Sequence, residues 1–253
     1  MRLGPVLSVA AMASLLLCFP FASSFAQEAT EPILVQVTTS DGVVLAGDFY
    51  VPAVVPAPAV LVFHQNNSDR TDARPLAEPL VAAGYAVLAV DQRGVGGSGG
   101  FWMPRAEIVL GDIRAWLAWL REQPEVRTEA VFTLGSSTGG LLALAGCADD
   151  AGCRSAIALS PTRDGNGLSR DTTEQMFAEP LRTRSVFLMV SVGDSQFDGY
   201  VREMIEWSRG ELGVYFFTGA AHGENLFTMD DHREQVVELI VDWLDAHLPE
   251  GEG

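Results

Sequence analysis

The chain has 253 residues, of which 48% are hydrophobic and 19% are charged, and its formal net charge is −17 at pH 7. This length and composition suit one large α/β domain or two small ones, and they exclude a disordered or fibrous chain. All 16 basic residues are arginines, and the acidic excess argues against nucleic acid or an anionic membrane surface as a partner.

The N-terminal stretch has the pattern of a secretory signal peptide. A positive charge follows the first methionine, residues 6–21 are apolar, and Ser24 and Ala26 are small residues at the two positions that a signal peptidase reads. The pattern predicts a signal peptide over residues 1–26, cleavage, and an exported protein, periplasmic or extracellular, without a stable membrane span. An uncleaved anchor and a lipoprotein signal at Cys18 are the alternatives.

Beyond this segment, apolar runs alternate with amphipathic helical patterns. The runs 33–39 and 43–51 flank a Ser-Asp-Gly turn and predict an antiparallel hairpin. Further strands are predicted at 59–63, 85–90, 130–134, 155–159, 185–190 and 212–217, and helices at 76–83, 107–120, 141–145 and 235–248. Buried strands alternating with helices predict an α/β fold with a mostly parallel central sheet and helices on both faces. Residues 27–253 show no linker and are expected to form one domain, with at most a small lid helix around 171–181.

The passage around Ser137 is the most informative motif. Gly135-Ser136-Ser137-Thr138-Gly139 matches the G-x-S-x-G pattern of a nucleophile elbow, in which a strand turns sharply into a helix with a serine at the tip. The glycines let strand and helix approach without a Cβ clash, and the helix N-terminus stabilises negative charge. We therefore predict Ser137 as a nucleophile; an ordinary turn built from glycine and serine is the alternative.

A serine nucleophile needs a general base and an acid that orients the base, and after an elbow both follow the serine, acid first. His222 lies in a loop of small residues just after the last predicted strand, whereas His232 and His247 lie in charged helical surroundings. His222 is therefore the expected base. Asp194, immediately past the preceding strand, is the expected acid, and Asp198 is the alternative.

Two backbone N–H groups are expected to stabilise an oxyanion. Thr138, directly after the nucleophile, supplies one of them. Asn66, in the loop after the strand 59–63, supplies the other, with Gln65 as its alternative.

An apolar segment follows a glycine-rich loop near the strand ends. Phe101 and Trp102, together with Met103, are predicted to line a substrate pocket with Gln65; packing under the next helix is the alternative.

Two cysteines of the mature chain lie close together in a polar stretch. Export predicts a local disulfide between Cys147 and Cys153, with two unpaired thiols as the alternative. No nearby cysteine or histidine completes a ligand set, so no metal site is predicted.

The motifs together resemble the α/β-hydrolase family over nearly all of the mature chain. Asp91 to Gly100 matches the family's D-x-R-G-x-G-x-S-x-G loop, and His64-Gln65 stands where the family usually has His-Gly. The surroundings of His222 are similar to those in its dienelactone-hydrolase-like and serine-aminopeptidase-like branches. The resemblance implies an α/β-hydrolase fold with a small lid or none, with Asp91 and Arg93 as scaffold residues.

The expected function is that of a serine hydrolase. Attack by a serine on a carbonyl carbon would cleave a small carboxylic ester, or a thioester or amide, through an acyl-enzyme and without a metal or organic cofactor. A serine exopeptidase is one alternative, with Asp171, Glu174 and Glu179 as an acidic site for a free amino terminus. A non-catalytic binding module on the same scaffold is another. The sequence carries no signal for the oligomeric state.

Overall fold

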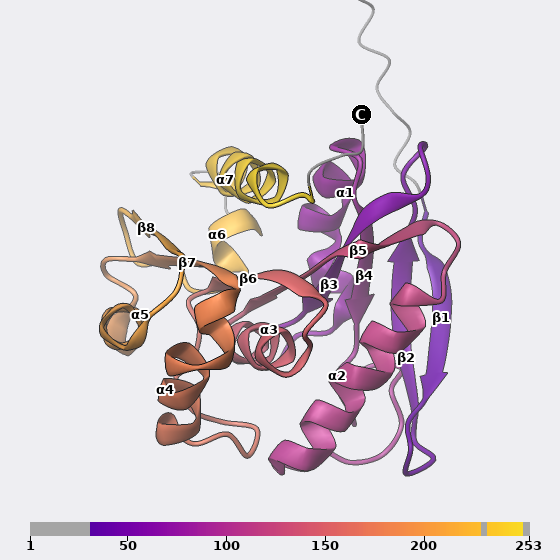
Figure 1. Cartoon of the computed structure of the whole chain (residues 1–253), viewed down its shortest axis with the longest axis horizontal. Helices are drawn as coiled ribbons and strands as arrows, with labels where there is room; N and C mark the ends of the chain where they lie inside the picture. Colours follow the sequence, from indigo (N-terminus) through magenta and orange to yellow (C-terminus); the bar gives the residue numbers. More distant parts are fainter. Residues whose placement is uncertain (1–30, 229–231, 250–253) are drawn as a thin grey trace, which may run out of the picture.

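An eight-stranded sheet forms the centre of the molecule, in a computed structural model that describes residues 31–228 and 232–249. The predicted signal peptide, residues 1–26, lies outside the described residues. The strand order is β1-β2-β4-β3-β5-β6-β7-β8 (Figure 1). The strands are β1 (Ile33–Thr38), β2 (Val44–Tyr50), β3 (Ala57–Phe63), β4 (Ala86–Val90), β5 (Val126–Ser136), β6 (Cys153–Leu159), β7 (Ser185–Ser191) and β8 (Leu212–Phe217). The α-helices are α1 (Arg74–Ala82), α2 (Ala106–Arg121), α3 (Thr138–Asp149), α4 (Arg170–Ala178), α5 (Ser195–Trp207), α6 (Asn225–Thr228) and α7 (Arg233–Ala246), and the 3₁₀ helices are η1 (Arg70–Ala73) and η2 (Pro180–Thr183).

The pairing of the strands confirms the predicted sheet. β1 and β2 form an antiparallel hairpin and β2 pairs antiparallel with β4, whereas all pairs from β4 to β8 are parallel. The six parallel strands therefore bring their carboxyl ends to one edge of the sheet. Loops that follow different strands meet at this edge, where sites collect in α/β folds.

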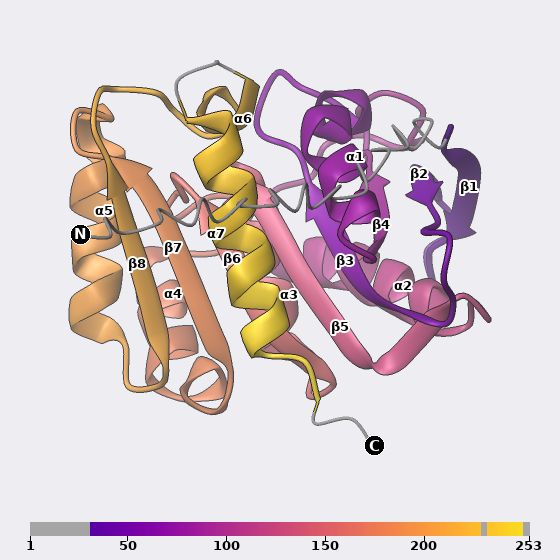
Figure 2. The same cartoon turned by 90° about the horizontal axis from the view of Figure 1, so that it is seen from above.

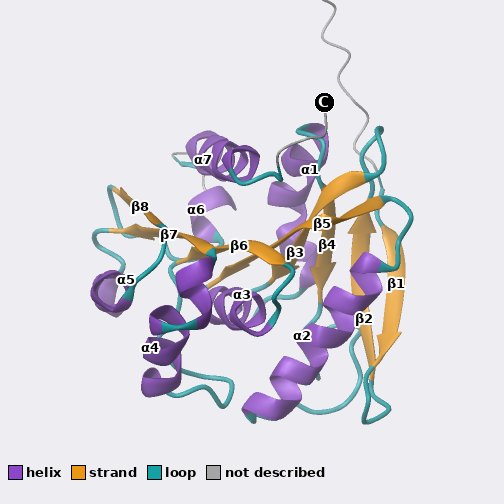
Figure 3. Cartoon of the chain, in the orientation of Figure 1, coloured by secondary structure: helices purple, strands orange, loops and turns teal. Residues whose placement is uncertain are grey.

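Helices cover both faces of the sheet, as predicted. α1 and α7 lie on one face and α2, α3, α4 and α5 on the other (Figures 1 and 3), and the view from above shows α7 lying over the middle of the sheet (Figure 2). The amphipathic pattern decides which sides are buried: α7 buries Val236, Ile240 and Leu244. Fully burying each such side chain contributes about 1.5–3 kcal/mol.

Two segments differ from what the sequence suggested. α5 was not predicted, although Val201, Met204 and Trp207 are spaced for one helix face and are buried. α4 occupies the position of the expected lid helix. It buries Met176 and Phe177 in the apolar cluster that α3 and α5 share, so α4 completes the helical layer. Within the described ranges, no helix has the length and hydropathy that crossing a bilayer requires.

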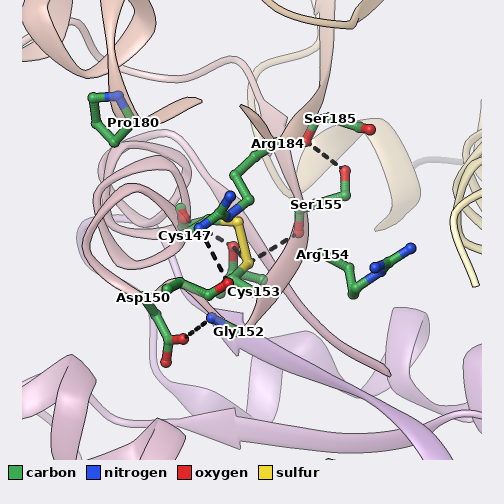
Figure 4. The surroundings of a disulfide bond; sticks show 12 residues. Cys147, Asp150, Gly152, Cys153, Arg154, Ser155, Pro180, Arg184 and Ser185 are labelled. Atoms are coloured by element: carbon green, nitrogen blue, oxygen red, sulfur yellow. Dashed lines mark hydrogen bonds between the residues drawn. A yellow bond between two sulfur atoms is a disulfide. The ribbon is translucent and has the colours of Figure 1, made fainter. Parts of the chain in front are cut away.

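The predicted disulfide between Cys147 and Cys153 is confirmed. It joins the last turn of α3 to the start of β6 with an S–S distance of 2.11 Å (Figure 4). Both cysteines are buried, although the intervening residues form a polar turn in which the Asp150 carboxylate accepts a hydrogen bond from the Gly152 N–H at 2.6 Å. The bond therefore fastens the far end of the helix that begins beside Ser137.

Arginine–carboxylate pairs hold the loop after β4. Arg93 is almost completely buried and binds Asp112 on α2 at 2.8 Å and Asp41 in the β1–β2 turn at 2.8 and 2.9 Å. The Arg93 guanidinium lowers the pKa of Asp41 to about 2. The fully buried Asp91 carboxylate accepts hydrogen bonds from the main-chain N–H groups of Arg70 at 2.8 Å and Gly97 at 2.6 Å. These contacts agree with a scaffold role for Asp91 and Arg93.

Candidate active site

The backbone around Ser137 turns sharply between β5 and α3. Ser137 has φ 53° and ψ −116°, a strained conformation that non-glycine residues rarely adopt. A Cβ at Gly135 would lie 2.1 Å from the carbonyl oxygen of Gly139, and a Cβ at Gly139 would lie 2.3 Å from that of Phe63. Both glycines are therefore required by backbone contacts, and the sequence motif has the geometry of an elbow.

Three of the predicted residues come together at the carboxyl edge of the sheet. His222, in the loop after β8, places its Nε2 atom 2.9 Å from Ser137 Oγ. Its Nδ1 atom lies 3.1 and 3.0 Å from the two carboxylate oxygens of Asp194, in the loop after β7. Because a carboxylate only accepts, Nδ1 carries the proton and Nε2 is free to accept the Ser137 hydroxyl proton.

The surroundings keep this arrangement in place. Ser137 and Asp194 are 6% and 4% exposed, so the hydroxyl and the carboxylate are shielded from water. The ring of Phe197, on α5, lies 4.1 Å from the His222 imidazole, centre to centre. Asp198, the alternative acid, lies one turn into α5 and pairs with Arg202 at 3.0 Å. Asp194, not Asp198, is hydrogen-bonded to the imidazole.

The two residues predicted to supply oxyanion donors are neighbours in space. The Thr138 hydroxyl donates to Asn66 Oδ1 at 3.3 Å, which joins the loop after β3 to the start of α3. Among the described residues, the backbone N–H groups of Asn66 and Thr138 have no hydrogen-bond acceptor. The Gln65 N–H, in contrast, donates to Glu224 Oε1 at 3.0 Å. Asn66 rather than Gln65 therefore has an N–H available for a ligand.

His64 precedes this loop and has a structural position. Its Nε2 accepts a hydrogen bond from the Gln92 N–H at 3.1 Å, and its Nδ1 donates to the Gln65 carbonyl oxygen at 2.7 Å. Burial lowers the pKa of His64, which keeps the ring neutral. The ring therefore connects the loops after β3 and β4.

The residues predicted to line a pocket are separated in the structure. Trp102 and Met103 line a small apolar pocket of about 40 Å³ between α2, α3 and the carboxyl ends of β3 and β4. The Trp102 indole N–H donates to Asn166 Oδ1 at 3.1 Å at this pocket. Phe101 is 84% exposed and Gln65 contacts the His222 loop, and neither lines the pocket.

Glu224 is a site residue that the sequence analysis did not identify. It is 6% exposed, and burial raises the pKa of its carboxyl group. Its position two residues after His222 is the only signal in the sequence that could have found it. In the part of the chain that the structure describes, no group of three or more histidine, cysteine or acidic residues is arranged to hold a metal ion.

Comparison with solved structures identifies the fold. An esterase of Pyrococcus furiosus is 20% identical with a TM-score of 0.70, over 87% of this chain and 92% of that chain. A dienelactone hydrolase of Anabaena variabilis is 19% identical with a TM-score of 0.71, over 87% of this chain and 100% of that chain.

Comparison with protein sequences identifies the family. An uncharacterized protein of Mycobacterium tuberculosis is 37% identical over 112 residues, which is 44% of this chain and only 39% of the length of that relative. The family model for X-Pro dipeptidyl-peptidases (S15 family) matches residues 41–177, more than half of the chain. The chain therefore belongs to the X-Pro dipeptidyl-peptidase (S15) family and has the α/β-hydrolase fold.

Proposed function

We propose that the protein is a serine hydrolase that cleaves a small carboxylic ester through an acyl-enzyme on Ser137. The observation that carries this proposal is the hydrogen-bonded chain from Ser137 Oγ through His222 to Asp194. Such a chain makes a serine hydroxyl nucleophilic, since the imidazole accepts the proton and the carboxylate stabilises the resulting charge.

The chemistry follows from these positions. Ser137 Oγ attacks the ester carbonyl carbon while its proton passes to His222 Nε2. The N–H groups of Asn66 and Thr138 stabilise the resulting oxyanion. The imidazolium then protonates the leaving alcohol as the C–O bond breaks, which leaves the acyl group on Ser137. In the second half, His222 takes a proton from water, whose oxygen attacks the acyl carbon, and Ser137 regains its proton as the acid is released.

The apolar pocket beside Trp102 is our candidate for the site of the acyl group. Leu142, on the helix that begins beside Ser137, lines it together with Phe63, which precedes the oxyanion loop. Because this pocket has a volume of only about 40 Å³, short acyl groups such as acetyl should be turned over faster than long acyl chains.

Labelling with a fluorophosphonate probe tests the proposal. The wild type should be labelled and should hydrolyse a p-nitrophenyl ester, and Ser137→Ala should lose labelling and about 10⁴-fold or more in kcat. A wild-type protein that neither reacts with the probe nor turns over any ester would exclude the proposal and favour a binding module.

An exopeptidase is a second candidate, favoured by the family match. It uses the same three residues but needs an acidic site for a free amino terminus. The three carboxylates considered for that role are exposed: Asp171 and Glu174 lie on α4, where Glu174 pairs with Arg170 at 3.4 Å, and Glu179 directly follows this helix. An X-Pro p-nitroanilide compared with a p-nitrophenyl ester separates the two candidates, and faster anilide turnover would replace the esterase proposal.

Export after signal cleavage remains a proposal. The buried disulfide supports it, because disulfides persist in oxidising compartments. Cell fractionation and sequencing of the mature amino terminus test it, and a cytoplasmic protein that begins at Met1 would contradict it.

A further inference from the structure

Gln65 occupies a position where the resembled family usually has glycine, and its side chain makes a specific contact. The Gln65 N–H donates to Glu224 Oε1 at 3.0 Å, and the Glu224 N–H donates to Gln65 Oε1 at 3.1 Å. Each side chain thus accepts a hydrogen bond from the main chain of the other residue. The two residues are 159 positions apart, so the pair joins the loop after β3 to the loop after β8.

The surroundings of this pair are built to fit it. The Ser68 hydroxyl lies 2.9 Å from the second carboxylate oxygen of Glu224 and 2.8 Å from Asp72 Oδ2, so its one proton is shared between two carboxylates. Gly223 has φ 54°, and a Cβ there would lie 2.3 Å from Gln65 Oε1. Glycine at 223 therefore leaves room for the Gln65 amide, and any larger residue would push it away.

The pair lies next to two groups that must keep fixed positions for the proposed reaction. Asn66, the proposed oxyanion donor, directly follows Gln65. His222, the proposed base, precedes Glu224 by two residues. A Cβ at Gly223 would also lie 3.5 Å from Ser136 Cβ, so the residue between His222 and Glu224 packs against the elbow beside the nucleophile.

We propose that Gln65 and Glu224 are positioning residues, whose reciprocal hydrogen bonds hold the Asn66 N–H and the His222 imidazole at fixed positions around Ser137 Oγ. This inference rests on the proposed acyl transfer at Ser137. A displacement of 1 Å in a group that acts on the transition state can cost about 10²-fold in rate, so two short loops need such a connection.

Kinetics of Gln65→Ala, Glu224→Ala and the double variant test the inference. The readouts are kcat and KM for a p-nitrophenyl ester and the rate of fluorophosphonate labelling, all measured well below each variant's melting temperature. Each single change should lower kcat and the labelling rate by about 10- to 100-fold, with little change in KM. The double variant should be no slower than the slower single variant, because both changes disrupt the same pair of hydrogen bonds.

Two further variants separate positioning from stability. Glu224→Gln keeps an oxygen that accepts the Gln65 N–H and should recover most of the rate. Tyr85→Phe removes a hydrogen bond to Asp245 beside the amino end of β4, at the opposite edge of the sheet, and should lower stability without changing kcat. If Glu224→Ala does not fold, Gln65→Gly, which introduces the residue usual in the family, takes its place.

The outcomes distinguish this inference from the proposed function. An active wild type whose variants keep its kcat, or whose effects multiply independently, would overturn the positioning role alone. Equal losses in Glu224→Gln and Glu224→Ala would also overturn it. A wild type without turnover or labelling would overturn both proposals.

Discussion

Replacing Arg93 by leucine removes the cation that holds three segments of the chain together. The guanidinium side chain is 7% exposed and faces Asp112, whose side chain is 14% exposed, and Asp41, which is 50% exposed. After the substitution, Asp41 can be solvated by water, but Asp112, whose side chain is only partly exposed, is left without its partner.

The expected loss follows from that difference in burial. Removing one partner of a buried ion pair costs about 3–5 kcal/mol, because the other charge stays desolvated. For a chain of this size, that loss lowers the melting temperature by roughly 6–20 °C. The rate of fluorophosphonate labelling of Ser137 at 25 °C should change little, because Arg93 contacts none of the three residues there. Ester turnover is not a suitable control, since Arg93 also lines the pocket proposed for the acyl group.

Urea unfolding followed by tryptophan fluorescence measures the loss. The double variant Arg93→Leu/Asp112→Leu should be more stable than Arg93→Leu, since it removes the uncompensated charge, and Asp41→Asn should be much less destabilising than Arg93→Leu. If Arg93→Leu lowers the free energy of unfolding by less than about 1 kcal/mol, a value typical of an exposed ion pair, the argument from burial is refuted. A double variant no more stable than the single one would refute it as well.

Two further measurements test other parts of the structure. Because the disulfide closes a loop of sequence separation 6, reduction should lower the free energy of unfolding by only about 2 kcal/mol, seen as a lower urea midpoint with reductant. The variant Cys147→Ala/Cys153→Ala should be insensitive to reductant, and an equal shift in that variant would contradict the assignment. Since burial lowers the pKa of His64 below its ordinary value of 6.5, its stabilising contacts are complete above pH 6.5 and are lost as the pH falls. The stability difference between the wild type and His64→Ala should therefore shrink on acidification, and a constant difference would show that the ring does not titrate with unfolding.

The sequence predicted the sheet because its strands are apolar runs of the right length, and it predicted the elbow because two glycines flank the serine at fixed spacing. It also placed Asp194 and His222, since parallel strands bring their carboxyl ends to one edge. The pair of Gln65 and Glu224 could not be predicted. Its partners are 159 positions apart and belong to no local pattern, so only the folded loops bring them together.

The absence of lysine gives the ion pairs of this fold an unusual dependence on pH. Lysine begins to lose its proton near pH 10.4, whereas arginine keeps it beyond pH 12, so the pairs made by Arg70 and Arg93 persist in strong alkali. At such a pH it is the ionisation of buried tyrosines that destabilises the folded state. Burial raises the pKa of Tyr50 to about 12. The contribution of Tyr50 to stability is therefore complete below pH 10 and is lost as the pH rises toward 12. Alkaline unfolding of this protein should accordingly begin with ionisation of phenol groups in the core, while the arginine–carboxylate pairs remain charged.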